Sequence, residues 1–145
     1  MGTAFYRGAD CALLVYDITN LESFEGLSNW KNNFLQKSME KQPQSFPFMA
    51  IGNKLDLEED CRAVHSNDLE NWCDSQTDNS IEFFETSAKE DVNVQDAFLG
   101  LVKKALKRKE QAEKLIKEKY AREFSLDQRP LKLLEDPSQN EARQG

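Results

Sequence analysis

Short apolar runs alternate along this chain with longer segments in which apolar residues recur at helical spacing. The runs are Cys11–Tyr16, Phe46–Ile51 and Ile81–Glu85. Apolar runs of this length are typical of strands buried on both faces, as in parallel sheets. Pro47 must lie at the start of its strand, where no backbone donor is needed.

Three helices are predicted between and after these strands. The first extends from Leu21 to about Gln36, with Thr19 or Asn20 as its cap, and the second spans Ser66–Ser75, with Ser66 as its cap. The third begins at Asn93 and keeps helical spacing of apolar residues through Leu106. Trp30 and Trp72 lie on the apolar helix faces and are predicted to belong to the core.

The alternation of strand and helix predicts an α/β fold with three parallel strands, flanking helices and a long C-terminal helix. The first 106 residues form the predicted domain. Residues 107–123 are rich in Lys and Glu and are predicted to be a charged helical extension. Residues 124–145 have the composition of a disordered tail.

Charge and cysteine content exclude several classes of function. The net charge is −7, so a nucleic acid is not an expected partner. No run approaches the roughly 18 apolar residues of a membrane-spanning helix. The three cysteines form no metal-type pair, which favours free thiols in a reducing, cytoplasmic compartment.

The segment Asn53-Lys54-Leu55-Asp56 directly follows the second strand. Ligands of open parallel sheets bind beyond the carboxyl ends of the strands. A carboxylate such as that of Asp56 can accept hydrogen bonds from both N1–H and the 2-amino group of guanine, whereas adenine offers no such pair. Asn53 can donate to a base while its carbonyl holds backbone, and the stem of Lys54 can lie over a base. The alternative is a turn in which Asn53 and Asp56 satisfy only the backbone.

A second segment, Thr86-Ser87-Ala88-Lys89, follows the third strand in the same way. Its loop is expected to converge on the same edge of the sheet. Ala88 is small enough for its backbone N–H to approach a ligand oxygen. A capped loop without a ligand is again the alternative, but two such segments after two parallel strands point together to a base site.

With these motifs the chain resembles the Ras-superfamily small GTPases, and within them the Rab branch, especially its late-endosomal and vacuolar type. The likeness extends from Met1 to about Leu106. It is carried by residues 4–11, Val15–Thr19, Phe46–Phe48, Gly52–Leu57 and Phe84–Glu90.

The resemblance implies GTP or GDP as the ligand. It implies that Asn53 and Asp56 recognise guanine, that Lys54 packs on the base, and that Ser87, Ala88 and Lys89 complete the pocket. It also implies Rab effectors and regulators as partners, vesicle and protein transport as the process, and the late endosome, vacuole or lysosome as the membrane.

Other parts of the family pattern are missing from this sequence. It contains no G-x-x-x-x-G-K-[ST] phosphate loop, no switch threonine for Mg²⁺ and no Asp-x-x-Gly-Gln. We therefore expect an N-terminally truncated domain that binds nucleotide weakly through its base and does not hydrolyse GTP. The first strand would be an exposed edge, which predicts marginal stability or aggregation.

Two alternatives to a GTPase remain open: a non-enzymatic fragment that competes for Rab partners, and a nonfunctional truncation. The chain ends without the prenylated cysteines that the family usually carries, so no lipid anchor is expected by that route.

Overall fold

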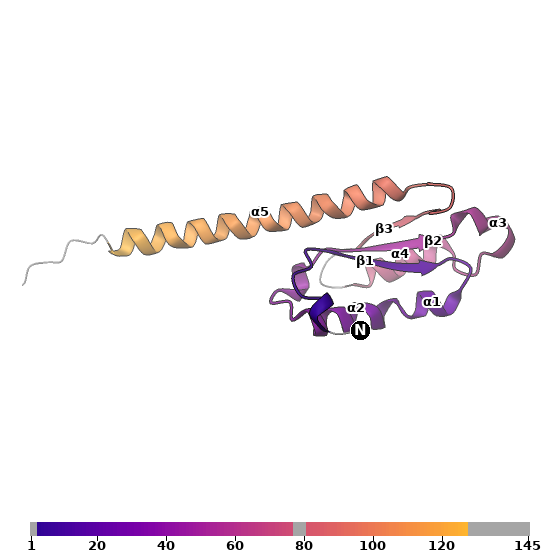
Figure 1. The fold of residues 1–145 in the computed structure, drawn as a ribbon, viewed down its shortest axis with the longest axis horizontal. Coiled ribbons are helices and arrows are strands. Elements are labelled where there is room, and N and C mark those ends of the chain that lie inside the picture. The colour runs from indigo at the N-terminus through magenta and orange to yellow at the C-terminus, as the bar shows by residue number, and fades with distance from the viewer. Residues whose placement is uncertain (1–2, 77–80, 128–145) are drawn as a thin grey trace, which may run out of the picture. The chain divides into compact units, whose positions relative to one another are not determined.

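The computed structural model describes residues 3–76 and 81–127 and contains three strands and five α-helices within them (Figure 1). In chain order these are β1 (Ala12–Asp17), α1 (Leu21–Glu25), α2 (Leu27–Ser38), β2 (Phe48–Asn53), α3 (Glu58–Cys61), α4 (Ser66–Asp74), β3 (Glu82–Glu85) and α5 (Val94–Asp127). The predicted α/β fold with three parallel strands and a long C-terminal helix is confirmed.

The strands form one parallel sheet in the order β1-β2-β3. Asp17 lies opposite Asn53, and Gly52 lies opposite Glu85. The last residues of all three strands therefore share one edge of the sheet. This carboxyl edge is where the fold places the segments that follow β2 and β3.

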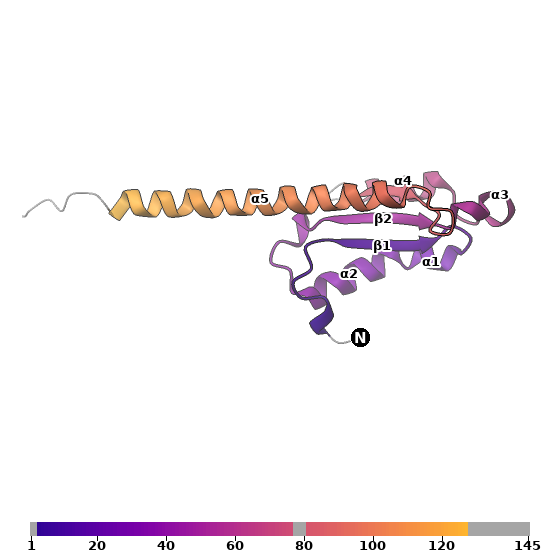
Figure 2. The same ribbon diagram turned by 45° about the horizontal axis from the view of Figure 1, so that its top comes forward.

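Helices cover both faces of the sheet (Figure 2). On one face, Leu14 and Phe48 pack in a core that includes Leu27 and Phe34 of α2 and Leu69 of α4. On the other face, the core contains Met49 and Ile51 of β2 and Ala97 and Leu101 of α5. The apolar strands are thus buried from two sides, as their continuous hydrophobicity predicts.

The predicted helix from Leu21 to Gln36 is divided in the structure. α1 ends at Glu25 and α2 begins at Leu27, with Gly26 between them. Glycine is a weak helix former, which explains why the division falls there. Asn20 caps α1 by accepting a hydrogen bond from the Ser23 N–H at 3.2 Å. The core assignment of Trp30 is wrong, because its side chain is 62% exposed.

The start of α4 also differs from the prediction. The N-cap is His65, whose N–H donates to the Asp68 carboxylate at 3.1 Å, and Ser66 is the first helical residue. Ser66 uses its hydroxyl elsewhere, to donate to Glu85 at 2.9 Å. Trp72 is half-buried, packs against the core and donates its indole N–H to the Ser28 hydroxyl at 3.0 Å.

The chain divides into two units, Met1–Glu110 and Gln111–Gly145. α5 begins in the first and ends in the second at Asp127, so it includes the first four residues of the predicted tail. Residues 128–145 of that tail lie outside the described residues. Among the helices that the structure describes, none combines the length and the hydropathy needed to cross a membrane.

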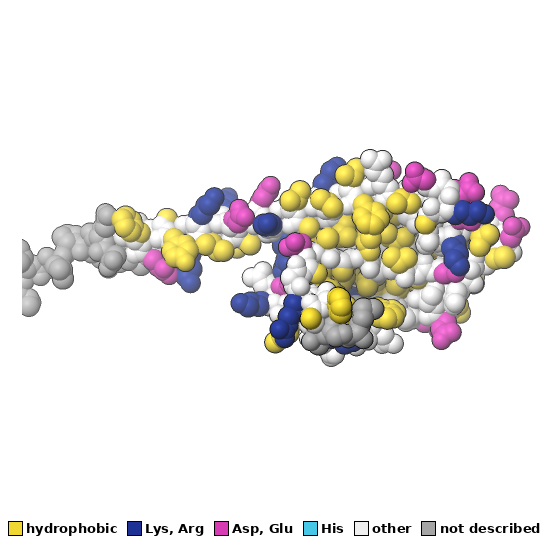
Figure 3. Space-filling view, viewed as in Figure 1, with side chains coloured by type: hydrophobic (Ala, Val, Ile, Leu, Met, Phe, Trp, Pro, Cys, Tyr) yellow, Lys and Arg dark blue, Asp and Glu magenta, His cyan; other side chains and the backbone are white. Residues whose placement is uncertain are grey.

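β1 forms the side edge of the sheet and, within the described residues, pairs with β2 alone. The Ala12 and Ile18 N–H groups donate toward β2, so the backbone groups of Leu13 and Val15 face away from it. A groove of about 300 Å³ beside this edge is lined by Tyr6, Leu27, Trp30 and Phe34 together with β1. Hydrophobic side chains gather on the side of the molecule shown in Figure 3, and Val15 is 54% exposed.

Candidate functional site at the carboxyl edge of the sheet

Asn53 ends β2, and its side chain joins the two predicted base loops. The Oδ1 atom accepts hydrogen bonds from the Ala88 N–H at 3.0 Å and from the Thr86 hydroxyl at 3.2 Å. The Nδ2 group donates to no described residue. The side-chain carbonyl oxygen of Asn53 thus holds the second loop.

Asp56 lies on the short 3-10 turn Leu55–Leu57 and faces the second loop. Its Oδ1 atom accepts a hydrogen bond from the buried Ser87 hydroxyl at 2.6 Å, and Ser87 Oγ in turn accepts from the Glu90 N–H at 3.0 Å. Because a carboxylate has about four acceptor positions, both oxygens can still accept from a ligand. An open cavity of about 330 Å³ is lined by Leu55, Asp56, Ser87, Glu90 and Val92.

The Lys54 side chain extends toward the end of β1. Its Nζ atom lies 2.6 Å from Asp17 Oδ2, and it does not line the cavity beside Asp56. Partial burial acts to raise the pKa of Asp17, but hydrogen bonds from Lys54 and Thr19 outweigh it, so the pKa is lowered. The hydrogen bond with Asp17 raises the pKa of Lys54. The structure therefore pairs Lys54 with a carboxylate that the sequence analysis did not assign to the site.

The backbone of the second loop is closed on itself. Ser87 and Val92 exchange two N–H to carbonyl hydrogen bonds of 3.0 and 3.1 Å. The Thr86 carbonyl accepts from the Leu55 N–H at 2.9 Å, which ties this loop to the first. Three of the four non-glycine residues with positive φ that the structure describes lie in these loops, namely Lys54, Asp91 and Asn93. Such conformations cluster at functional sites.

The structure brings together four of the six predicted site residues, Asn53, Asp56, Ser87 and Ala88. The Ala88 N–H, predicted to approach a ligand oxygen, donates to Asn53 Oδ1 here. Lys89 is exposed on the same loop.

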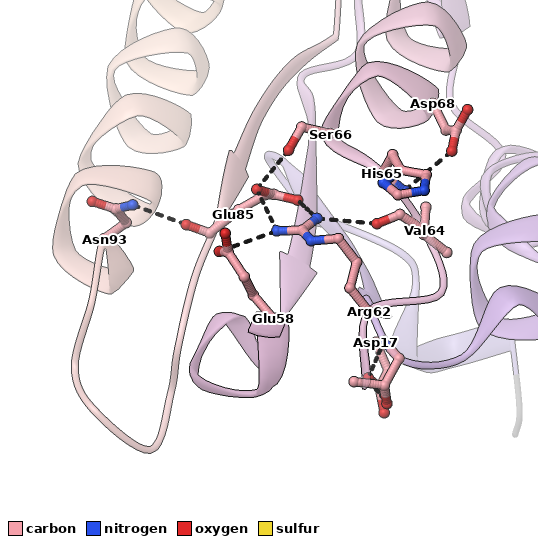
Figure 4. A network of polar contacts seen from close by, with 10 residues as sticks. Asp17, Glu58, Arg62, Val64, His65, Ser66, Asp68, Glu85 and Asn93 are labelled. Carbon is pink, nitrogen blue, oxygen red and sulfur yellow. Dashed lines mark hydrogen bonds and ion pairs between the residues drawn. The ribbon is translucent and has the colours of Figure 1, made fainter. Parts of the chain in front are cut away.

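Arg62 and Glu85 form a two-point ion pair close to the site (Figure 4). The sequence did not indicate that these two residues interact. Arg62 Nη1 and Nη2 lie 2.5 and 3.1 Å from the two carboxylate oxygens of Glu85. Burial acts to raise the pKa of Glu85, but hydrogen bonds from Arg62 and Ser66 lower it overall. The only sequence signal was the position of Glu85 at the end of a strand.

The described residues contain no group of three or more His, Cys, Asp and Glu side chains placed to hold a metal ion.

A sequence model of the Ras family matches residues 1–107. The chain belongs to the Ras family. It is 48% identical over 113 residues to the Ypt/Rab-type GTPase avaA of Emericella nidulans, covering 78% of this chain and 54% of that protein. It is 49% identical over 107 residues to the Ras-related protein RABG3b of Arabidopsis thaliana, covering 73% and 52% of the two proteins.

The chain is 46% identical over 113 residues to the Ras-related protein Rab7 of Drosophila melanogaster, covering 78% of this chain and 53% of that protein. This Ras-family chain thus spans about half the length of the curated relatives that it matches. The predicted likeness to the Rab branch is confirmed, because these relatives carry Rab-type names.

Proposed function

We propose that this Ras-family chain recognises the guanine base of GTP and GDP at the carboxyl edge of its sheet. The observation that carries the proposal is the convergence of the two loops, in which Asn53 holds Ala88 and Asp56 holds Ser87. In this arrangement Asp56 is fixed by a short hydrogen bond while its carboxylate borders an open cavity. A turn that served the backbone alone would need neither feature.

The proposed recognition depends on matched donors and acceptors. The Asp56 carboxylate accepts from N1–H and from the 2-amino group of guanine, and the Asn53 amide donates to a base acceptor. Adenine has an acceptor at N1 and no 2-amino group, so it would leave Asp56 facing a lone pair. A mismatch of this kind costs on the order of 1–3 kcal/mol, by analogy with bidentate base contacts.

Titration of the chain with GDP, ADP and xanthosine diphosphate tests this proposal, with binding followed by amide chemical shifts. We expect GDP to bind more tightly than ADP by about tenfold or more. Asp56→Asn should make the chain bind xanthosine diphosphate more tightly than GDP, because the 2-oxo group of xanthine accepts a hydrogen bond from an amide. Asp60→Asn removes an exposed charge from the nearby α3 and is the matched control. Equal binding of GDP and ADP would contradict the proposal.

For the chain by itself we propose weak nucleotide binding and no hydrolysis of GTP. Support comes from the sequence, which holds no glycine-rich phosphate loop to surround the phosphates. Most of the stabilisation in phosphoryl transfer comes from such phosphate and metal contacts. A dissociation constant for GDP below about 1 µM, which corresponds to roughly 8 kcal/mol, would contradict this part of the proposal.

We also propose a role in Rab-dependent vesicle traffic at the late endosome, vacuole or lysosome, with Rab effectors and regulators as partners. The proposal rests on the resemblance to the Rab branch, and the Rab-type names of the relatives support that resemblance. A second candidate is a non-enzymatic fragment that competes for those partners. It is favoured by the exposed apolar side chains of Val15, Trp30 and Phe98. Binding to Rab regulators that persists unchanged in Asp56→Asn and without nucleotide would favour this candidate.

A further inference from the structure

Arg62 lies between α3 and α4, outside the predicted base site, and its side chain is only 14% exposed. Its guanidinium makes a two-point contact with the Glu85 carboxylate at 2.5 and 3.1 Å. It also donates to the Val64 carbonyl at 3.0 Å and lies 3.3 Å from Glu58 (Figure 4). A planar guanidinium held at several points fixes orientation as well as distance.

Glu85 is held at both its side chain and its backbone. The carboxylate accepts from Arg62 and from the Ser66 hydroxyl, and the backbone carbonyl accepts from the Asn93 side chain at 2.9 Å. The second base loop, which begins at Thr86, therefore starts from a residue whose position is fixed. Asn93 closes the same loop at its other end.

Arg62 belongs to the segment that carries Asp56. The near end of this segment continues from β2, and its middle is the one-turn helix α3, which has no side-chain cap and three exposed acids in sequence. Such a short helix has little stability of its own. Its far end is held by backbone hydrogen bonds from Ala63 and Val64 to Ile18 and by the Arg62 side chain on Glu85.

The contacts of Arg62 and those of the backbone have different consequences. The bonds to Ile18 tie the segment to the end of β1, whereas Arg62 ties it to β3, the strand that leads into Ser87 and Ala88. Loss of Arg62 would therefore leave the segment folded, but the distance between Asp56 and the second loop would be less tightly fixed.

We propose that Arg62 is a positioning residue, which sets the distance between the two base loops through its ion pair with Glu85. It thereby determines how closely the Asp56 carboxylate can contact the base. The proposal rests on the proposed guanine recognition. Arg62 itself does not line the cavity beside Asp56.

The first measurement needs no ligand. Amide hydrogen exchange is compared in the wild-type chain, Arg62→Gln and Arg62→Lys at three positions: the Leu55 and Ala88 N–H groups, which join the loops, and the Ala50 N–H in β2. We expect Arg62→Gln to raise exchange at Leu55 and Ala88 on the order of tenfold, with Ala50 unchanged. Arg62→Lys keeps the charge but loses the two-point contact, so its effect should be intermediate.

Arg108→Gln is the matched control, because Arg108 forms a similarly buried pair with Glu40 at 2.8 Å, away from the base loops. It should leave exchange at Leu55 and Ala88 unchanged. The double variant R62E/E85R, which reverses the pair, should restore part of the protection. If exchange at Leu55 and Ala88 is unchanged in Arg62→Gln, or rises equally at Ala50, the positioning role is excluded.

The second measurement is the affinity ratio between GDP and inosine diphosphate, which lacks the 2-amino group that Asp56 is proposed to recognise. A merely structural defect would weaken both ligands equally, whereas loss of positioning should bring the ratio in Arg62→Gln toward one. An unchanged ratio would overturn the proposal. If the wild-type chain does not prefer GDP to ADP, the proposed function fails, and the exchange measurement still decides whether Arg62 sets the loop spacing.

Discussion

At the carboxyl edge of the sheet, the strands lead into loops whose polar groups are hydrogen bonded to one another. Along the side edge of β1, the backbone groups of Leu13 and Val15 face outward beside an apolar groove. Both regions are margins of the same sheet, where backbone groups have no neighbouring strand to pair with. They differ in whether side chains form hydrogen bonds with those backbone groups.

Ser23 marks the boundary between the two regions. Its hydroxyl accepts from the Asp17 N–H at 3.0 Å and lies 3.2 Å from the Asp17 carbonyl, so the edge of β1 is closed at its last residue. No side-chain contact of this kind is formed at Leu13 or Val15 by the described residues. The edge of β1 is therefore closed by a side chain at Asp17, whereas at Leu13 and Val15 it is suited to a further strand.

The largest change in the free energy of unfolding is expected for a substitution at Gly52, near the end of β2. A Cβ added at Gly52 would lie 2.7 Å from the Tyr16 hydroxyl oxygen and 3.0 Å from Ile18 Cγ2, both within the core. Because these side chains are packed, Gly52→Ala should destabilise the chain by about 2 kcal/mol, measured by urea denaturation. The base loops would be displaced together with Asn53.

Two variants calibrate this result. Gly26→Ala has its closest contacts at 3.5 Å in a helical conformation, so it should be neutral or stabilise by up to about 1 kcal/mol. The Tyr16 hydroxyl finds no partner among the described residues. Tyr16→Phe should therefore be tolerated and should recover part of the loss in Gly52→Ala. Equal stabilities of Gly52→Ala and Gly26→Ala would show that the packing argument is wrong.

A smaller effect concerns the pH dependence of the Arg62–Glu85 pair. The pKa of Glu85 is lowered from its ordinary value of 4.5, because the hydrogen bonds from Arg62 and Ser66 outweigh the effect of burial. A depressed carboxyl pKa adds stability above the unfolded-state pKa, and this stability is lost as the pH falls through the folded-state value. Glu85→Gln loses the charge-assisted hydrogen bonds and should destabilise the chain by about 1 kcal/mol at neutral pH. The difference should shrink as the pH falls below about 4.

Glu59→Gln is the control for this pH dependence, since Glu59 is exposed on α3. Its free energy of unfolding should differ from that of the wild-type chain by less than about 0.5 kcal/mol throughout. A Glu85→Gln effect that grew toward acid pH would have the opposite sign to the one derived from the lowered pKa.

The sequence was sufficient to predict the strands and the convergence of the base loops. Apolar runs identify strands buried on both faces, and a parallel order places every strand end at one edge. Asn53 and Asp56 could be proposed as site residues for this reason. Their contacts with Thr86 and Ser87 follow from the pairing of β2 with β3.

Other features depended on which side chains meet across the fold. Helical spacing placed Trp30 on an apolar face, but spacing does not show whether another element covers that face. Arg62 and Glu85 are 23 positions apart, and no local pattern links them. The turn of Lys54 toward Asp17 likewise depends on the left-handed backbone of Lys54 and the register of β1 with β2.

The smallest effect on stability, and the most direct test of the side edge, is expected for Val15→Lys. Val15 is 54% exposed, so the free energy of unfolding should change by less than about 0.5 kcal/mol. A lysine on an edge strand opposes the addition of another strand, because its charge would have to be desolvated. Light scattering at increasing concentration should therefore show self-association of the wild-type chain and much less in Val15→Lys.

Leu115→Lys adds the same charge on the exposed part of α5 and should leave self-association unchanged. A wild-type chain that stays monomeric, or variants that associate equally, would mean that the outward-facing groups of Leu13 and Val15 do not recruit another strand.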